Sequence, residues 1–102
     1  MRTSLFLCIA AVAAAACARV AEAQDSAAAR SLAATCANCH GTEGRSATKE
    51  VASLAGMSRA HIVSQMKAFK DGTRPATVMH QLAKGYTDSQ IELLADYFAA
   101  KK

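Results

Sequence analysis

The stretch Cys36-Ala37-Asn38-Cys39-His40-Gly41 decides the fold of this 102-residue chain. Two thiols three residues apart lie on one turn of a helix, and an imidazole directly follows the second thiol. This C-x-x-C-H pattern is typical of covalent haem attachment, in which each thiol bonds one vinyl group and the histidine binds the iron. The sequence therefore predicts one covalent haem c held by Cys36 and Cys39, with His40 as an axial ligand of the iron.

Three other roles for these cysteines fit the sequence less well. A thioredoxin-like redox pair needs a preceding strand and a βαβ setting, and the sequence has no strand pattern. A zinc site needs two further ligands, and only His61 and His80 remain, at a spacing unlike that of common zinc modules. A disulfide between residues three apart closes a loop too small to stabilise the fold much.

Outward from the motif, helix signals predict three main helices. They cover residues 27–40, 59–70 and the segment that follows residue 87. Each starts after a side chain that caps helices well: Asp25 or Ser26, then Ser58, then Thr87, which forms a capping box with Gln90. The first helix ends at a glycine next to the motif, and the second stops at Asp71-Gly72. The predicted fold class is therefore all-α.

The segments between these helices, 41–57 and 73–86, show no regular spacing of apolar residues and are predicted as loops. Two loops of this length are unusual in so small a domain unless they wrap a ligand. We therefore expect the chain to fold around the haem. The apolar residues expected to form the core and the wall around the haem are Ile62, Met66, Phe69, Leu82, Ile91, Leu94 and Phe98.

Composition separates the first 23 residues from the rest. Eighteen of them are apolar, against 35 of the following 79, and 16 of those 35 are alanine. A positive start, an apolar stretch over 5–18 and the ending Ala21-Glu22-Ala23 predict a secretory signal peptide over 1–23, followed by a monohaem domain over 24–102. The apolar stretch is too short for a spanning helix. The expected location is periplasmic, with lipid anchoring at Cys17 as an alternative.

The small stock of large apolar side chains excludes several classes of protein. A core of this size contributes only about 3–5 kcal/mol to the free energy of folding. A domain so small usually needs an additional stabilising element, such as a cross-link or a bound group. The composition leaves no room for a second domain or a large enzyme cleft, and two cysteines outside the signal do not make a conventional disulfide scaffold. The net charge of +4 comes without a dense basic run, so nucleic-acid binding is not expected.

The second axial ligand has five candidates: Met57, Met66, Met79, His61 and His80. Met66 falls on the apolar stripe of the second helix and is expected in the core. Met57 lies just before a helix cap, and His61 is expected at the surface. Met79 lies in the loop that can fold over the ring and is the preferred ligand, with His80 as its rival. Met/His ligation raises the reduction potential and fills both axial positions of the iron.

Beyond the haem motif, the chain resembles class I c-type cytochromes over residues 26–100. The resemblance implies a small class I cytochrome c fold and an electron-transfer protein, not an enzyme. The features that carry it, in the family's order, are Cys36–Gly41, the Leu54-Ala55-Gly56 turn, the helix end over 65–72, Met79, and Leu94 and Tyr97 of the last helix.

More narrowly, the segments 76–79 and 82–87 resemble the cytochrome subunit of flavocytochrome c sulfide dehydrogenase. That resemblance implies an FAD-containing partner subunit that oxidises sulfide and passes its electrons to the haem. A free diffusible carrier between respiratory complexes is the alternative. An open-iron enzyme or sensor is a third class, which Met79 ligation would exclude.

The chain departs from the family at Ala52. The family usually has a proline there, whose carbonyl accepts a hydrogen bond from the ligating histidine. We expect the Ala52 carbonyl to accept from His40 still, in a looser loop. Four cations flank the ligand loop and are either a docking patch for an acidic redox partner or simply solvated: Lys67, Lys70, Arg74 and Lys84.

Overall fold

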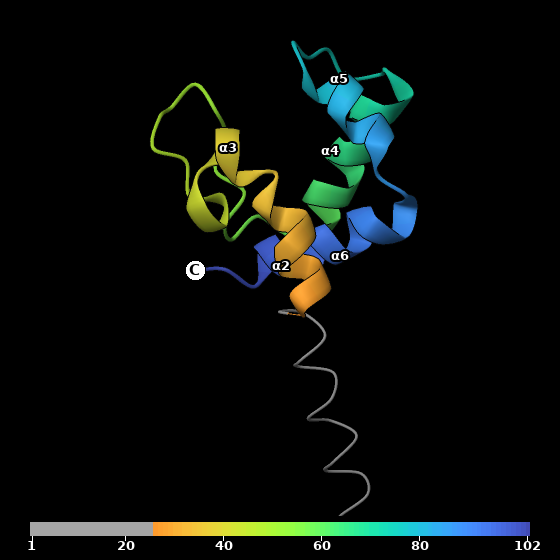
Figure 1. Ribbon diagram of the computed structural model, residues 1–102. Coiled ribbons are helices and arrows are strands. Elements are labelled where there is room, and N and C mark those ends of the chain that lie inside the picture. Colours follow the sequence, from red (N-terminus) through yellow and green to blue (C-terminus); the bar gives the residue numbers. More distant parts are fainter. Residues whose placement is uncertain (1–25) are drawn as a thin grey trace, which may run out of the picture.

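The computed structural model describes residues 26–102, and all regular structure within that range is helical (Figure 1). The main helices are α2 (Ala27–Ala34), α4 (Arg59–Asp71) and α6 (Asp88–Ala99). Between them lie the short helices α3 (Ala37–His40) and α5 (Met79–Leu82) and the 3-10 turns η1 (Thr42–Gly44) and η2 (Ala83–Gly85). The predicted all-α class is confirmed, while the predicted loop over 73–86 holds two short helical segments. The predicted signal peptide and Cys17 lie outside the described residues.

The three main helices begin where the caps predict. The Ser26 hydroxyl accepts a hydrogen bond from the Ala29 N–H at 3.2 Å, and that of Ser58 accepts from the His61 N–H at 3.3 Å. Thr87 and Gln90 form the complete capping box at the start of α6. Each cap satisfies a backbone N–H that has no partner within the helix.

The prediction of one continuous helix over 27–40 is wrong. The Thr35 hydroxyl donates to the Leu32 carbonyl at 2.9 Å, and the Cys36 N–H bonds at 3.0 Å to Ala33, three residues back. In a regular α-helix the Cys36 N–H would bond to Leu32, four residues back. The turn therefore tightens between α2 and α3, at the first cysteine of the motif.

The core forms where α6 packs against α2 and α4. Its buried members are Ala29, Ala33, Ile62, Leu94, Ala95, Tyr97 and Phe98. The predicted burial of Ile62, Ile91, Leu94 and Phe98 is confirmed. Met66 and Phe69 are half-buried, and Leu82, expected in the core or the haem wall, is 50% exposed because α5 lies at the rim of the fold. Small alanines on α2 leave the space in which α6 approaches it closely.

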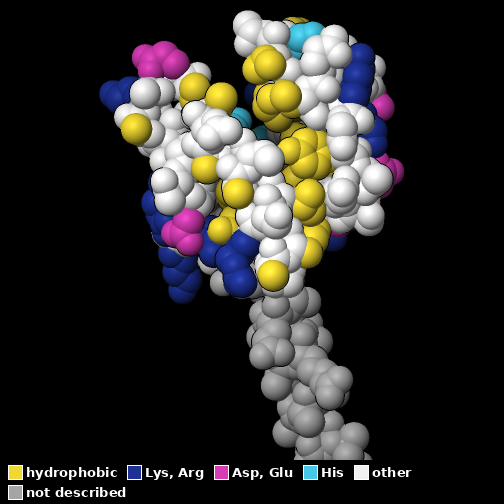
Figure 2. Space-filling model, in the orientation of Figure 1, with side chains coloured by type: hydrophobic (Ala, Val, Ile, Leu, Met, Phe, Trp, Pro, Cys, Tyr) yellow, Lys and Arg dark blue, Asp and Glu magenta, His cyan; other side chains and the backbone are white. Residues whose placement is uncertain are grey.

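The helices leave a hollow between two halves of the domain. In Figure 1, α3 and the loop after it stand on one side, α4 and α5 stand on the other, and α6 runs beneath both. Hydrophobic side chains face into this hollow in Figure 2. Across residues 26–102, no helix is long and apolar enough to cross a membrane.

Candidate functional site

The hollow contains a cavity of about 580 Å³, whose walls come from both halves of the domain. One wall carries the C-x-x-C-H motif and the Val51–Leu54 segment, and the other carries α4, α5 and the segment between them. Its lining includes Cys36, Cys39, His40, Phe69, Arg74 and Met79. A mostly apolar cavity of this size falls within the range of about 300–1,000 Å³ that holds small molecules and cofactors.

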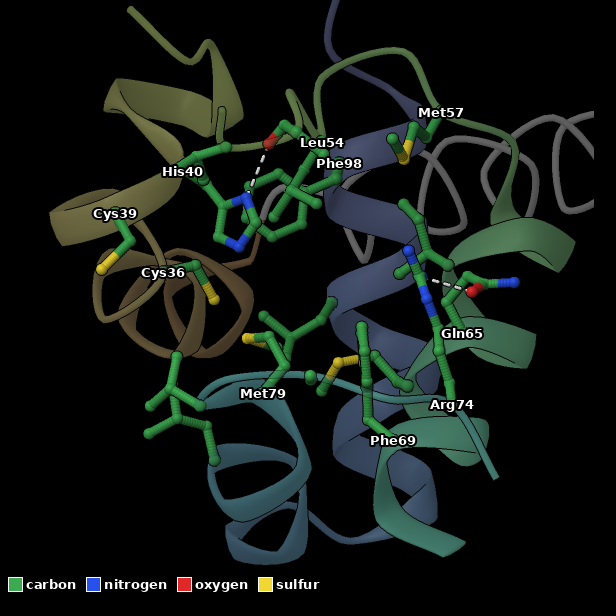
Figure 3. A pocket seen from close by; sticks show the side chains of 18 of the residues that line it. Cys36, Cys39, His40, Leu54, Met57, Gln65, Phe69, Arg74, Met79 and Phe98 are labelled. Carbon is green, nitrogen blue, oxygen red and sulfur yellow. Dashed lines mark hydrogen bonds between the residues drawn. The ribbon is translucent and has the colours of Figure 1, made fainter. Parts of the chain in front are cut away.

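Cys36 and Cys39 lie next to His40 on the same short helical stretch (Figure 3). Both thiols are free; Cys36 is half-buried and Cys39 is exposed. Burial raises the pKa of the Cys36 thiol, with hydrogen bonding acting in the opposite direction.

Gly41 completes the motif for a steric reason. It leaves α3 with φ of +82°, and a Cβ built there would lie 1.9 Å from the Arg45 carbonyl oxygen. Only glycine adopts this conformation with no side chain to collide. The sharp exit sends the following chain back past His40, so that the Ala52 segment reaches the imidazole.

His40 is held by a hydrogen bond of 2.6 Å between its Nδ1 and the Ala52 carbonyl oxygen. A carbonyl only accepts hydrogen bonds, so Nδ1 carries the proton. The lone pair of the neutral ring is then on Nε2, the atom free to bind a metal. The hydrogen bond expected at Ala52 is present although the family's proline is absent.

Met79 lies across the cavity from His40, at the start of α5 (Figure 3). His80 does not line the cavity, and its Nδ1 is buried without a hydrogen-bond partner. Met57 and Met66 line the cavity but also pack against the core, and His61 is exposed at its edge. The geometry thus favours Met79 over its rivals as the side chain opposite His40.

These residues fit a haem c. The donor set is an imidazole nitrogen and a thioether sulfur, which reach one apolar cavity from its two walls. Two unpaired thiols lie beside the imidazole at the spacing of the vinyl bonds. This combination is the ligand set of cytochromes c in which histidine and methionine bind the iron.

Tyr86 is a part of the site that sequence reasoning missed. Its hydroxyl lies 2.8 Å from the Thr35 hydroxyl, which directly precedes Cys36, and Lys70 Nζ donates to the Tyr86 carbonyl at 2.7 Å. Lys70 also lies 3.5 Å from Asp88. The sequence left open whether Lys70 contacts a partner or is simply solvated; in the structure its ammonium group also bonds to the connection between α5 and α6. A tyrosine between a glycine and a helix cap was the available signal, since a half-buried tyrosine hydroxyl needs a polar partner.

Comparison with known proteins gives the family. The chain matches no family model. It is 34% identical over 81 residues to cytochrome c-554(548) of Halomonas halodenitrificans, an alignment that covers 76% of this chain and 98% of that protein. The chain belongs to the c-type cytochromes.

Two further c-type cytochromes are similar to this chain over part of their length. The cytochrome subunit of sulfide dehydrogenase of Chlorobaculum tepidum is 45% identical over 60 residues, which cover 59% of this chain and 54% of that subunit. Cytochrome c4 of Pseudomonas aeruginosa is 36% identical over 78 residues, which cover 76% of this chain and 39% of that protein. This c-type cytochrome thus spans about half of the first relative and less of the second.

The relatives and the all-helical structure confirm the predicted family and class I fold. As a c-type cytochrome, the chain carries covalent haem c and serves in electron transfer.

Proposed function

We propose that this cytochrome holds a single haem c through thioether bonds to Cys36 and Cys39, with His40 and Met79 as the axial ligands of the iron. The observation that carries the proposal is the orientation of His40. The Ala52 carbonyl holds the proton on Nδ1, and Met79 lies across the same cavity. The proposed function is electron transfer without a change of ligands.

When bound, the haem supplies a one-electron ferric–ferrous couple. The chain contributes an imidazole of fixed tautomer and a thioether, which together leave no open coordination position. Leu94 and Phe98 of α6 wall the inner end of the cavity and exclude water from it. A low-polarity surrounding and a methionine ligand both favour the ferrous state and so raise the reduction potential.

The rim beside Met79 is the proposed point of electron exit and entry. Val78 is 48% exposed and Leu82 is 50% exposed, and both line the cavity. Exposed apolar side chains at the mouth of a cofactor site are suited to brief contact with a partner protein. Electrons would then pass between the partner and the nearest edge of the ring.

The proposed partner is an FAD-containing protein that oxidises sulfide. Support comes from the 45% identity to a cytochrome subunit of sulfide dehydrogenase, together with the resemblance of residues 76–79 and 82–87 to such subunits.

We propose further that residues 1–23 are a signal peptide that directs the domain 24–102 to the periplasm, with a lipid on Cys17 as the alternative.

A free electron carrier is the second candidate. It is favoured by the match to cytochrome c-554(548), which extends over 98% of that protein, whose name mentions no enzyme or subunit. The two candidates differ in whether a flavoprotein stays bound to this chain.

Purification from the native source separates them. We expect the haem protein to elute from a sizing column with a flavin-containing polypeptide, and added sulfide to reduce its haem in that fraction. A lone small haem protein that sulfide reduces only after a separate flavoprotein is added back would support the free carrier. A chain that lacks covalent haem in the native extract contradicts the proposal as a whole.

A further inference from the structure

Arg74 is fixed in the cavity wall opposite the cysteines. Its guanidinium carbon lies 4.6 Å from the centre of the Phe69 ring, and its Nη1 donates a hydrogen bond to Gln65 Oε1. Its backbone N–H bonds to the Ala68 carbonyl at 3.2 Å, in the turn that follows Gly72. Both the backbone and the guanidinium group of Arg74 are therefore held in place. Little conformational freedom is left for a bound ligand to remove.

Arg74 is also the only Lys or Arg among the described residues that line the cavity. The other carboxyl and imidazole side chains along the walls are those of Glu50, His40 and His61. An anionic group within the cavity thus finds one permanent positive charge. The side chain as a whole is exposed, which puts that charge at the mouth of the cavity.

The structure of the haem indicates which of its groups would contact Arg74. A haem carries its two vinyl groups on one half of the porphyrin and its two carboxylate side chains, the propionates, on the other half. Cys36 and Cys39 lie along one side of the cavity and Arg74 lies along the other side (Figure 3). A ring bonded to the cysteines would therefore direct its carboxylates towards the wall that holds Arg74.

We infer that Arg74, positioned by Gln65 and Phe69, binds a haem propionate. A guanidinium has five N–H donors, and the bond to Gln65 Oε1 occupies one of its groups, so donors remain for a carboxylate. Stacking on Phe69 orients the guanidinium plane. The inference rests on the proposed haem site and assigns a residue to a part of the haem that the axial ligands do not touch.

An ion pair between Arg74 and a haem propionate would offset the negative charge of that propionate. Negative charge near the iron favours the ferric state. Loss of the guanidinium should therefore lower the reduction potential. The full chain, matured with haem, is made as wild type and as the variants Arg74→Gln, Arg74→Lys and Gln65→Ala. Lys67→Gln is the matched control, because Lys67 is an exposed cation on α4 outside the cavity. The readouts are the midpoint potential and the propionate bending vibration in the resonance Raman spectrum.

We expect Arg74→Gln to lower the potential more than Lys67→Gln does and to shift the propionate vibration, which Lys67→Gln should leave in place. Arg74→Lys keeps the charge but not the fork of donors, so its potential should lie between those of the wild type and Arg74→Gln. Gln65→Ala should also lower the potential, by less than Arg74→Gln does. If Arg74→Gln does not accumulate, Arg74→Lys and Gln65→Ala carry the test. Unchanged potential and vibration in haem-loaded variants would overturn the role of Arg74 and leave the proposed function intact. A wild-type chain without covalent haem would overturn both.

Discussion

The Nδ1 atom of His40 lies 2.6 Å from the carbonyl oxygen of Ala52, twelve residues along the chain. This one hydrogen bond fixes the tautomer of the imidazole and turns Nε2 towards the cavity. The Ala52 backbone supplies the acceptor, so the contact does not depend on the side chain at position 52.

Ala52→Pro should therefore stabilise the protein without changing the haem environment. Proline limits the backbone of the unfolded chain, and a compatible X→Pro change typically adds about 0.4–1 kcal/mol. Within residues 26–102, the Ala52 N–H makes no backbone hydrogen bond that proline would remove. Denaturant titration of the haem-loaded protein measures the effect, with the absorption spectrum as the control. A lower free energy of unfolding, or an altered spectrum, would mean that the loop does not accept proline's backbone angle.

Met79→Ala should remove the second axial ligand, while His80→Ala should not. Met79 lines the cavity and His80 does not. We expect Met79→Ala to lose the weak near-infrared band of methionine bound to ferric haem, to lower the reduction potential, and to bind carbon monoxide in the ferrous state. His80→Ala should keep the band. A wild-type protein without the band, whose ferrous haem binds carbon monoxide in His80→Ala but not in Met79→Ala, would assign the second axial position to His80 instead.

Gly44→Ala should destabilise the fold by about 1–3 kcal/mol, the usual range for an overpacked core. Gly44 has φ of +79°, and a Cβ there would lie 2.8 Å from the ring of Phe98. Gly85→Ala is the control, because a Cβ at Gly85 meets nothing within 4 Å, and we expect a change of less than about 0.5 kcal/mol. Thermal or denaturant unfolding gives both values, and equal effects would argue against contact between Gly44 and Phe98.

Glu43 should make stability depend on pH in the acid range. A hydrogen bond from Arg45 at 2.7 Å, followed by the charge of Lys101, lowers the pKa of the Glu43 carboxyl below its ordinary value of 4.5. Because the pKa is lower in the folded state, the carboxylate stabilises the fold above its unfolded pKa, and this contribution is lost as pH falls through the folded pKa.

The comparison of wild type with Glu43→Gln tests this dependence. We expect a small stability advantage of the wild type near neutral pH that shrinks as pH is lowered below 4.5. Asp71→Asn, which also removes an exposed carboxylate, is the control for the change in net charge. An advantage that stayed constant or grew with acidification would contradict the ion pair.

The local features of the fold were predictable because they depend on neighbours in sequence. Ser58 and Thr87 cap their helices within three residues, and those helix starts are confirmed. Gly41 ends the motif helix for a reason that is also local. The break at Thr35 was missed because its hydroxyl competes for the Leu32 carbonyl, a choice that helix propensity does not resolve.

Contacts between distant segments were the part that the sequence did not reveal. Tyr86 and Thr35 are 51 residues apart, and their hydrogen bond depends on how the two halves of the domain meet. A lysine in a helix is usually a solvated surface cation, yet the Lys70 ammonium group donates a hydrogen bond to the Tyr86 carbonyl. Arg74 belonged to the same group of four cations, predicted either to dock a partner or to be simply solvated, and the structure places it against the Gln65 side chain and the Phe69 ring at the cavity. Charge alone does not tell a docking cation from one that holds the fold together.

The most direct test of the central claim is the pyridine haemochrome spectrum of the purified protein after extraction with acidified acetone. The account predicts that the haem stays with the polypeptide and that its band position is that of a ring with both vinyl groups saturated. Cys36→Ser or Cys39→Ser should move the band to that of a ring with one free vinyl group. Haem that leaves with the solvent, or a wild-type band of a ring with two free vinyl groups, would contradict covalent attachment at Cys36 and Cys39.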